Sequence, residues 1–151
     1  MTPIGSVRRQ GDSLRLIIEP DYRPGLTGLE HFSHVIVLWW AGQVLDTQYR
    51  HVLQTRPPYA EEHVTGVFAC RAEYRPNPIA MTVCKLDSLD EQAGILKVAN
   101  IDALDGSLIL DLKPYFPVCD RVSQASIPEW LAGWPEWMPE EGIGLYDGEG
   151  Q

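Results

Sequence analysis

The stretch GVFACRAEYRPNPIA, residues 66–80, is the part of the chain that decides its fold. Its apolar start at residues 67–69 predicts the end of a β-strand. Arg75 and Asn77 each precede a proline, and the residue before a proline is sterically kept out of helical geometry. We therefore predict a stiff, extended loop over residues 71–77, from which arginine side chains can offer paired N–H donors to a carboxylate or phosphate. Such a rigid placement is more typical of a binding site than of a spacer.

Around this stretch, apolar and polar residues alternate with a period of two, which predicts β-strands. The predicted strands span residues 4–7, 14–18, 35–40, 81–89, 95–101 and 108–113. Residues 35–40 are apolar on both faces, as expected of a strand that is covered on each side. In the last strand, the alternation predicts that Leu108, Leu110 and Leu112 share an apolar face. Asp111 and Lys113 lie two residues apart on the opposite face, so we expect them to form an ion pair.

Two stretches are expected to lie outside these strands. Residues 42–65 are polar and contain the sequence Arg-Pro-Pro, so we predict a long excursion away from the strands. Ser126 and Glu129 have the spacing of a capping box and predict a short helix that ends by Gly133. We expect the tryptophans of this region to cover a barrel end or a dimer seam, with stacking on a ligand as the alternative. They are Trp130, Trp134 and Trp137.

The composition is that of one globular domain. The chain has 151 residues, of which 44% are apolar, and no apolar run approaches the roughly 18 residues that span a membrane. The start MTPIGSVRRQGDS places its basic residues after its apolar ones, the reverse of a secretory signal, so we expect a cytoplasmic protein without a membrane partner. The cysteines are widely spaced with no CxxC pair, which favours buried thiols over a disulfide framework or a zinc site. They are Cys70, Cys84 and Cys119.

Other enzyme classes lack their motifs in this chain. No Gly-x-Ser-x-Gly, P-loop or dinucleotide fingerprint is present, which argues against a serine hydrolase, an NTPase and a dehydrogenase. His31 and His34 have no Cys, Asp or Glu at metal-ligand spacing, so we predict no metal site. His51 and His63 lie in the polar excursion, where we expect them to be solvated.

Residues 66–80 are also similar to the signature GVFATRS..RPNPIG of the TsaA-like family, which is also called YaeB or TrmO. GLEHFSH at residues 28–34 resembles the family's GLE.FSH, and DALDGSLILDLKPYFP at residues 102–117 resembles D..DGTP..DIKPY.P. The three motifs stand in the family's order, so the chain is identified as a short member. The resemblance implies an S-adenosylmethionine-binding β-barrel, usually dimeric. The family's known reaction is N6 methylation of the threonylcarbamoyl-modified adenosine beside the tRNA anticodon.

The fold that we predict is therefore mainly β: a single closed or partly open β-barrel with short helices in its connections and at the C-terminus. The barrel domain is expected over residues 1–137, and an acidic, flexible tail over residues 138–151. By resemblance, the residues that line the cofactor site are Gly42, Gln43, Arg71, Met81, Asp102, Ala103, Leu104 and Asp105. For Asp105, a plain turn-forming role in Asp-Gly is an equal alternative.

Methyl transfer from a sulfonium is an in-line displacement, so the enzyme mainly aligns the acceptor, the methyl group and the sulfur. We predict that Asn77, locked between two prolines, and Arg75 carry this alignment. Several positions depart from the family pattern. A family histidine is replaced by Gly42, and the P.Q-type segment between the first two strands is reduced to Arg9-Gln10. One set of cofactor contacts therefore has no counterpart in the sequence.

The net charge of the chain bears on which molecule can accept the methyl group. The formal net charge is −9, which is unfavourable for a protein that must neutralise tRNA phosphates. Six of the 21 acidic residues follow Pro128, where no basic residue occurs; the remaining 15 against 12 basic residues leave −3 for the body of the chain. Two functions stay open: a methyltransferase acting on tRNA adenosine or another nucleophile, and a non-catalytic barrel that binds S-adenosylmethionine or a related nucleoside as a sensor or interaction module.

Overall fold

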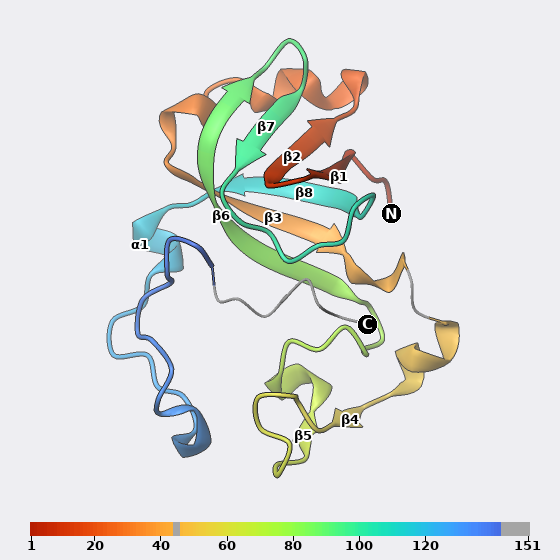
Figure 1. Ribbon diagram of the computed structural model, residues 1–151, viewed down its shortest axis with the longest axis vertical. Coiled ribbons are helices and arrows are strands. Elements are labelled where there is room, and N and C mark those ends of the chain that lie inside the picture. The colour runs from red at the N-terminus through yellow and green to blue at the C-terminus, as the bar shows by residue number, and fades with distance from the viewer. Residues whose placement is uncertain (44–45, 143–151) are drawn as a thin grey trace.

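Six antiparallel strands close into a barrel in this computed structural model, which describes residues 1–43 and 46–142 (Figure 1). Their order around the barrel is β1-β2-β7-β6-β3-β8, and β1 pairs with β8 to close it. The strands are β1 Gly5–Gln10, β2 Ser13–Ile18, β3 His34–Trp40, β6 Ile79–Asp90, β7 Ile95–Val98 and β8 Leu108–Pro114. The predicted mainly β, closed-barrel fold is confirmed.

Short elements occupy the connections. A two-stranded sheet, β4 Gln54–Thr55 with β5 Thr65–Gly66, lies in the predicted excursion between β3 and β6. The single-turn and 3-10 helices are η1 Pro20–Leu26, η2 Leu29–His31, η3 Ala41–Gln43, η4 Thr47–His51, η5 Val67–Ala69, α1 Pro117–Asp120 and η6 Glu129–Leu131. The predicted strand end at residues 67–69 is wrong. The strand stops at Gly66, because the next residues turn so that the Val67 carbonyl reaches the Arg75 side chain.

The barrel interior is filled by alternate residues of the strands. Val7, Leu16, Val35, Leu96 and Ile109 are fully buried. Each fully buried aliphatic side chain of this size contributes roughly 1.5–3 kcal/mol relative to an exposed one. The predicted strands therefore supply the core of the barrel through their buried apolar residues.

Strand β8 departs from its predicted phase. Leu108 is 38% exposed, whereas Ile109 is fully buried, the reverse of the prediction. The pairing with β3 explains the difference: it advances from Asp111 directly to Ile109, so Leu110 is the extra residue of a β-bulge. The predicted ion pair of β8 is confirmed, with 2.7 Å between Lys113 Nζ and Asp111 Oδ2.

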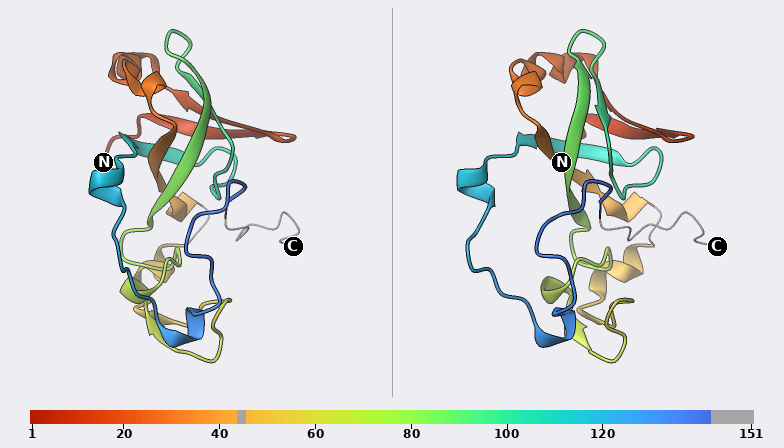
Figure 2. Two further views of the ribbon diagram at one scale, coloured as in Figure 1. Left: turned by 90° about the vertical axis from the view of Figure 1, so that its left-hand side faces the viewer. Right: turned by 60° about the vertical axis from the view of Figure 1, so that its left-hand side comes forward.

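The chain after β8 leaves the barrel and runs beside the excursion (Figure 2). Two of its tryptophans contact excursion residues: the Trp134 ring centre lies 5.0 Å from that of Tyr59, and Trp130 stacks on His63 at 4.4 Å. These two therefore cover the excursion rather than the barrel end, whereas the guanidinium carbon of Arg121 lies 5.8 Å from the Trp137 ring centre. His63 is correspondingly half-buried and not solvated as predicted.

Two further predictions for this segment are wrong. η6 begins after Pro128 without a side-chain cap, so Ser126 does not form the predicted capping box. Pro128 has an extended backbone with ψ 150°, and only one turn follows it. Cys119 is exposed on α1, whereas Cys70 and Cys84 are buried as predicted. Of the predicted flexible tail, residues 143–151 lie outside the described residues.

Candidate functional site

Arg75 maintains the shape of the RPNP loop, which we define as residues 71–78. Its Nε donates to the carbonyl oxygen of Ala72 at 2.8 Å, and one terminal nitrogen donates to those of Val67 and Cys70 at 2.5 and 2.6 Å. The guanidinium is thus engaged inside the loop, where it satisfies backbone groups that have no strand partner. These contacts give Arg75 a structural task, and its catalytic role stays a prediction.

Pro78 fixes the other end of the RPNP loop to the barrel. It is fully buried, and its carbonyl oxygen accepts a hydrogen bond from the Ala41 N–H at 2.8 Å. Gly42 lies against the same proline, so that a Cβ atom there would stand 2.6 Å from Pro78 Cγ and 3.0 Å from Trp40 Nε1. This close approach accounts for a glycine at position 42 and joins η3 to the RPNP loop.

Arg71 and Asn77 remain exposed on this fixed loop. The Asn77 carbonyl oxygen accepts from the Ile79 N–H at 2.7 Å, so the backbone is held while the amide side chain stays accessible. Tyr59 lies beside Arg71. Burial, and then the charge of Cys70, raise the pKa of Tyr59, while a hydrogen bond from the Arg71 backbone and the Arg71 charge oppose the rise. Arg71 therefore presents a cation next to a partly buried phenol.

A second group of predicted residues lies on the β7–β8 loop, residues 99–107, with Asp102 anchored to β6. Thr82 donates its hydroxyl hydrogen to Asp102 Oδ1 at 2.5 Å and accepts from the Trp39 indole N–H at 3.1 Å. Burial, and then the charge of Asp102, raise the pKa of Cys84 to about 12. Since Asp102 is itself exposed, the barrel presents an oriented carboxylate at its surface.

Asp105 forms the turn that leads into β8. The Leu104 carbonyl oxygen accepts from the Ser107 N–H at 3.1 Å, and Gly106 takes the positive φ of 78° that such a turn requires. Asp105 Oδ1 accepts from the backbone N–H of Arg9 at 2.8 Å. The turn-forming role is thus observed, and cofactor contact by Asp105 stays a prediction.

The predicted cofactor residues do not all lie on one face. Met81, next to Thr82 in β6, has its side chain on the opposite face of the strand, where it is 43% exposed. The Ala103 side chain is fully buried, so only its backbone could contact a ligand. Gln43 ends η3, and the prediction for its side chain lies outside what the structure describes.

Strand β6 connects the two groups. Pro78 immediately precedes the strand, and Thr82, which holds Asp102, is its fourth residue. At about 3.3 Å per residue, four residues correspond to roughly 13 Å along the strand. The RPNP loop and the β7–β8 loop are therefore both tied to the first part of β6 (Figure 1).

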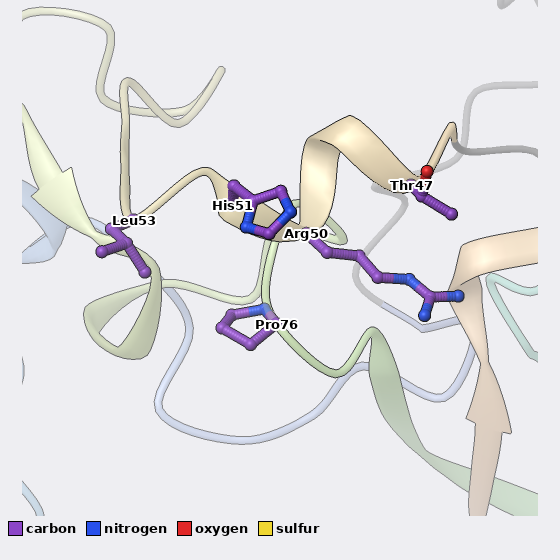
Figure 3. A pocket seen from close by; sticks show the side chains of 5 residues that line it. All are labelled: Thr47, Arg50, His51, Leu53 and Pro76. Carbon is purple, nitrogen blue, oxygen red and sulfur yellow. The ribbon is translucent and has the colours of Figure 1, made fainter.

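A solvent-open hollow of about 520 Å³ lies beside the RPNP loop (Figure 3). Its lining residues are Thr47, Arg50, His51, Leu53 and Pro76. His51 lies over Pro76, whereas the Arg50 side chain runs away from both, and its guanidinium carbon stands 5.3 Å from the Trp40 ring centre. The hollow combines basic and apolar groups, a suitable lining for a nucleobase and its phosphate.

The sequence reasoning missed several residues that build the site. Thr82 and Trp39 orient Asp102 through buried hydrogen bonds, and Arg9 binds the β7–β8 loop from the first hairpin. Thr82 and Trp39 carry no motif signal, since each acts through a partner distant in sequence. Arg9 stands out in the sequence only as a remnant of the P.Q-type segment, and its hydrogen bonds to the β7–β8 loop are not predicted. Over residues 1–43 and 46–142, no cluster of three His, Cys, Asp or Glu side chains is suited to hold a metal ion. The same part of the chain contains no helix that is both long and apolar enough to traverse a membrane.

This barrel, with its proline-fixed loop and its anchored aspartate, matches a known family. Residues 1–121 match the family model described as tRNA-methyltransferase O N-terminal domain. The chain therefore belongs to this family, and the resemblance read from its motifs is confirmed.

Individual relatives agree. The chain is 39% identical over 109 residues to an S-adenosyl-L-methionine-binding protein of Archaeoglobus fulgidus, covering 72% of this chain and 73% of that protein. It is 34% identical over 125 residues to the tRNA (adenine(37)-N6)-methyltransferase of Escherichia coli, covering 81% of this chain and 52% of that enzyme. A second, probable S-adenosyl-L-methionine-binding protein of Archaeoglobus fulgidus is 40% identical over 126 residues, and the match spans 83% of this chain but only 31% of that protein.

Solved structures share the fold. The crystal structure of TrmO superposes with a TM-score of 0.64 at 35% identity, over 84% of this chain and 64% of that one. TrmO from Pseudomonas aeruginosa gives a TM-score of 0.64 at 33% identity, over 83% and 59% of the two chains. Both comparisons support the barrel architecture, and both structures extend beyond the part that this chain matches.

Proposed function

We propose that this protein is an S-adenosylmethionine-dependent methyltransferase. The observation that carries the proposal is that β6 joins two fixed groups: the RPNP loop with its exposed Arg71, which leads into the strand, and the oriented carboxylate of Asp102, which is held by the fourth residue of the strand. The cofactor is a zwitterion with a sulfonium cation, and such a ligand needs an anion for its ammonium or sulfonium and a cation for its carboxylate. In this proposal Asp102 and Arg71 supply that pair of charges. The names of two relatives, an S-adenosyl-L-methionine-binding protein and a methyltransferase, support the choice of cofactor.

The residues take distinct roles in this proposal. When bound, S-adenosylmethionine supplies the methyl group. Arg71 donates to the ligand carboxylate, and Asp102, held by Thr82, offers its carboxylate to the positive end of the ligand. Asn77 orients the acceptor with an amide on a fixed backbone. Such a site works by alignment and needs no strong general base.

The acceptor that we propose is the modified adenosine beside the tRNA anticodon, the reaction type named for the Escherichia coli relative. The hollow beside the RPNP loop supports a nucleotide acceptor, because Arg50 and His51 line it together with apolar groups. The net charge of −9 opposes a phosphate-bearing acceptor, and six of the acidic residues follow Pro128 on the tail that contacts the excursion.

We further propose that the protein is a homodimer and acts in the cytoplasm. Exposed apolar side chains support a self-association surface, with Ile79 at 44% and Met81 at 43% on the outer face of β6 and Trp137 at 64% on the tail. Light scattering at micromolar concentration should then give twice the chain mass of 17.0 kDa. A particle of the single-chain mass would refute the dimer.

A radiolabelled methyl-transfer assay tests the proposed activity. The protein and labelled S-adenosylmethionine are incubated with tRNA that carries the threonylcarbamoyl group but lacks the final N6 methyl group. Label in the tRNA, absent when fully methylated tRNA is used, is the expected result. Tight binding of S-adenosylmethionine by calorimetry without any transfer would instead favour the non-catalytic sensor.

A further inference from the structure

The β7–β8 loop is fixed by Arg9, near the end of β1, the strand that pairs with β8. The Arg9 Nε donates to the Ala103 carbonyl oxygen at 2.7 Å, and a terminal nitrogen donates to the carbonyl oxygen of Ile101. The backbone N–H of the same residue donates to Asp105 Oδ1 at 2.8 Å. One residue of the first hairpin thus binds the loop on both sides of Asp102.

We propose that Arg9 is a positioning residue for the cofactor site, which holds residues 101–105 in the conformation that presents Asp102. This inference rests on the proposed S-adenosylmethionine site. The two carbonyl oxygens that Arg9 binds flank Asp102 in the sequence, so their directions determine where the carboxylate stands. Thr82 donates a hydrogen bond to the same carboxylate. The loop is therefore held through its backbone by Arg9 and through the Asp102 side chain by Thr82.

The fork of the guanidinium is essential to this role. Two carbonyl groups two residues apart need donors in a planar, fixed geometry, which arginine provides and the single ammonium of lysine does not. Arg9 is also half-buried, so water replaces its hydrogen bonds less readily than it would at the surface. Loss of the fork should therefore disorder the loop without removing the barrel core.

Arg8 is a matched control on the same strand. Its side chain is 57% exposed, and its terminal nitrogen stands 4.0 Å from Asp105 Oδ2, the limit of an ion pair. It has the same charge as Arg9 and a neighbouring position. An effect of charge alone would appear in both variants, whereas an effect of loop positioning would appear in Arg9 variants only.

The test compares the full-length wild type with Arg9→Ala, Arg9→Lys and Arg8→Ala. Calorimetry with S-adenosylhomocysteine and S-adenosylmethionine measures affinity, and amide NMR spectra measure the order of residues 101–105. We expect both Arg9 variants to weaken binding by about 10- to 100-fold, the range for loss of charged hydrogen bonds, with loop amides broadened. Arg8→Ala should stay within about twofold of the wild type, as expected for an exposed pair. In the methyl-transfer assay, the KM for S-adenosylmethionine should rise in the Arg9 variants while the KM for tRNA stays unchanged.

Several results would overturn the inference. A folded Arg9→Ala protein with wild-type affinity would do so, as would an equal effect of Arg8→Ala or full recovery by Arg9→Lys. If both Arg9 variants fail to fold, the residue is structural and the positioning role is refuted. A wild-type protein that binds neither ligand would refute the proposed function; in that case, ordered loop amides in Arg9→Ala would separately refute the positioning role.

Discussion

At the scale of single residues, the two arginines of the RPNP loop differ in task. Arg75 is engaged with three backbone carbonyl oxygens of its own segment, whereas Arg71 is exposed beside Tyr59. The sequence placed both in one rigid loop, because the proline rule acts locally. It could not distinguish their roles, since the carbonyl groups that Arg75 binds lie in η5 and the residues that follow it, whose path a local sequence pattern does not give.

Replacement of Arg75 by alanine should lower the free energy of unfolding by about 1.5–3 kcal/mol, because three carbonyl groups lose a charged donor. Urea unfolding measures this, with Arg71→Ala as the control that should unfold like the wild type. A stable Arg75→Ala protein that has lost its turnover would instead establish the predicted catalytic role.

Asn77 should matter more for turnover than the exposed His51 or His31. Its amide is carried on a backbone fixed by Pro78, and an alignment mechanism depends on such a group rather than on proton transfer. Rates of methyl transfer for Asn77→Ala, His51→Ala and His31→Ala provide the comparison. A loss of about a hundredfold or more in a histidine variant, the scale of general acid–base catalysis, with Asn77→Ala still active, would exclude the alignment model.

The buried thiol of Cys84 should make stability depend on alkaline pH. Its pKa is raised from 9.0 to about 12 by burial and then by Asp102, so the folded state retains a proton that the unfolded state loses above pH 9. The contribution of the neutral thiol to the free energy of unfolding is therefore complete below pH 9 and falls by up to about 1.4 kcal/mol per pH unit above it. Urea unfolding between pH 8 and 10.5 should therefore give a steeper fall for the wild type than for Cys84→Ala. Equal slopes would show that the thiol is not shielded.

At the scale of elements, the sequence predicted what depends on local pattern and missed what depends on pairing. The apolar patterns identified all six barrel strands: β3 by a continuous apolar run, of which residues 35–37 are all buried, and others by a period of two. The phase of β8 was wrong because a bulge at Leu110 depends on the register with β3. The capping box at Ser126 failed because the extended Pro128 starts the helix two residues later.

The Thr82 hydroxyl group of β6 links Trp39 of β3 to Asp102 of the β7–β8 loop through two hydrogen bonds, and we expect the stability of the protein to depend on it. Thr82→Val leaves the buried indole N–H of Trp39 unpaired and frees Asp102, which should cost about 1–3 kcal/mol of stability. Thr82→Ser keeps the hydroxyl and should recover most of the loss. Thermal or urea unfolding distinguishes them, and equal stability of the two variants would argue against this chain of contacts.

At the scale of the whole molecule, barrel closure brings together segments that are distant in sequence. Arg9 of β1 contacts residues 101–105, and Trp130 and Trp134 of the tail cover the excursion next to the RPNP loop. The candidate site could therefore be predicted only as two motifs, at residues 66–80 and 102–117. The attachment of both motifs to β6, and the residues that hold them there, become visible only when the order of the strands in the barrel is known.

A crystal structure of this protein with bound S-adenosylhomocysteine would locate the cofactor site. We expect the ligand near the start of β6, with its carboxylate on the Arg71 guanidinium and with contacts to the loop around Asp102. Density for the ligand elsewhere, such as the hollow on the outer side of β2 and β7 near Arg15 and Lys97, would contradict the assignment of the site.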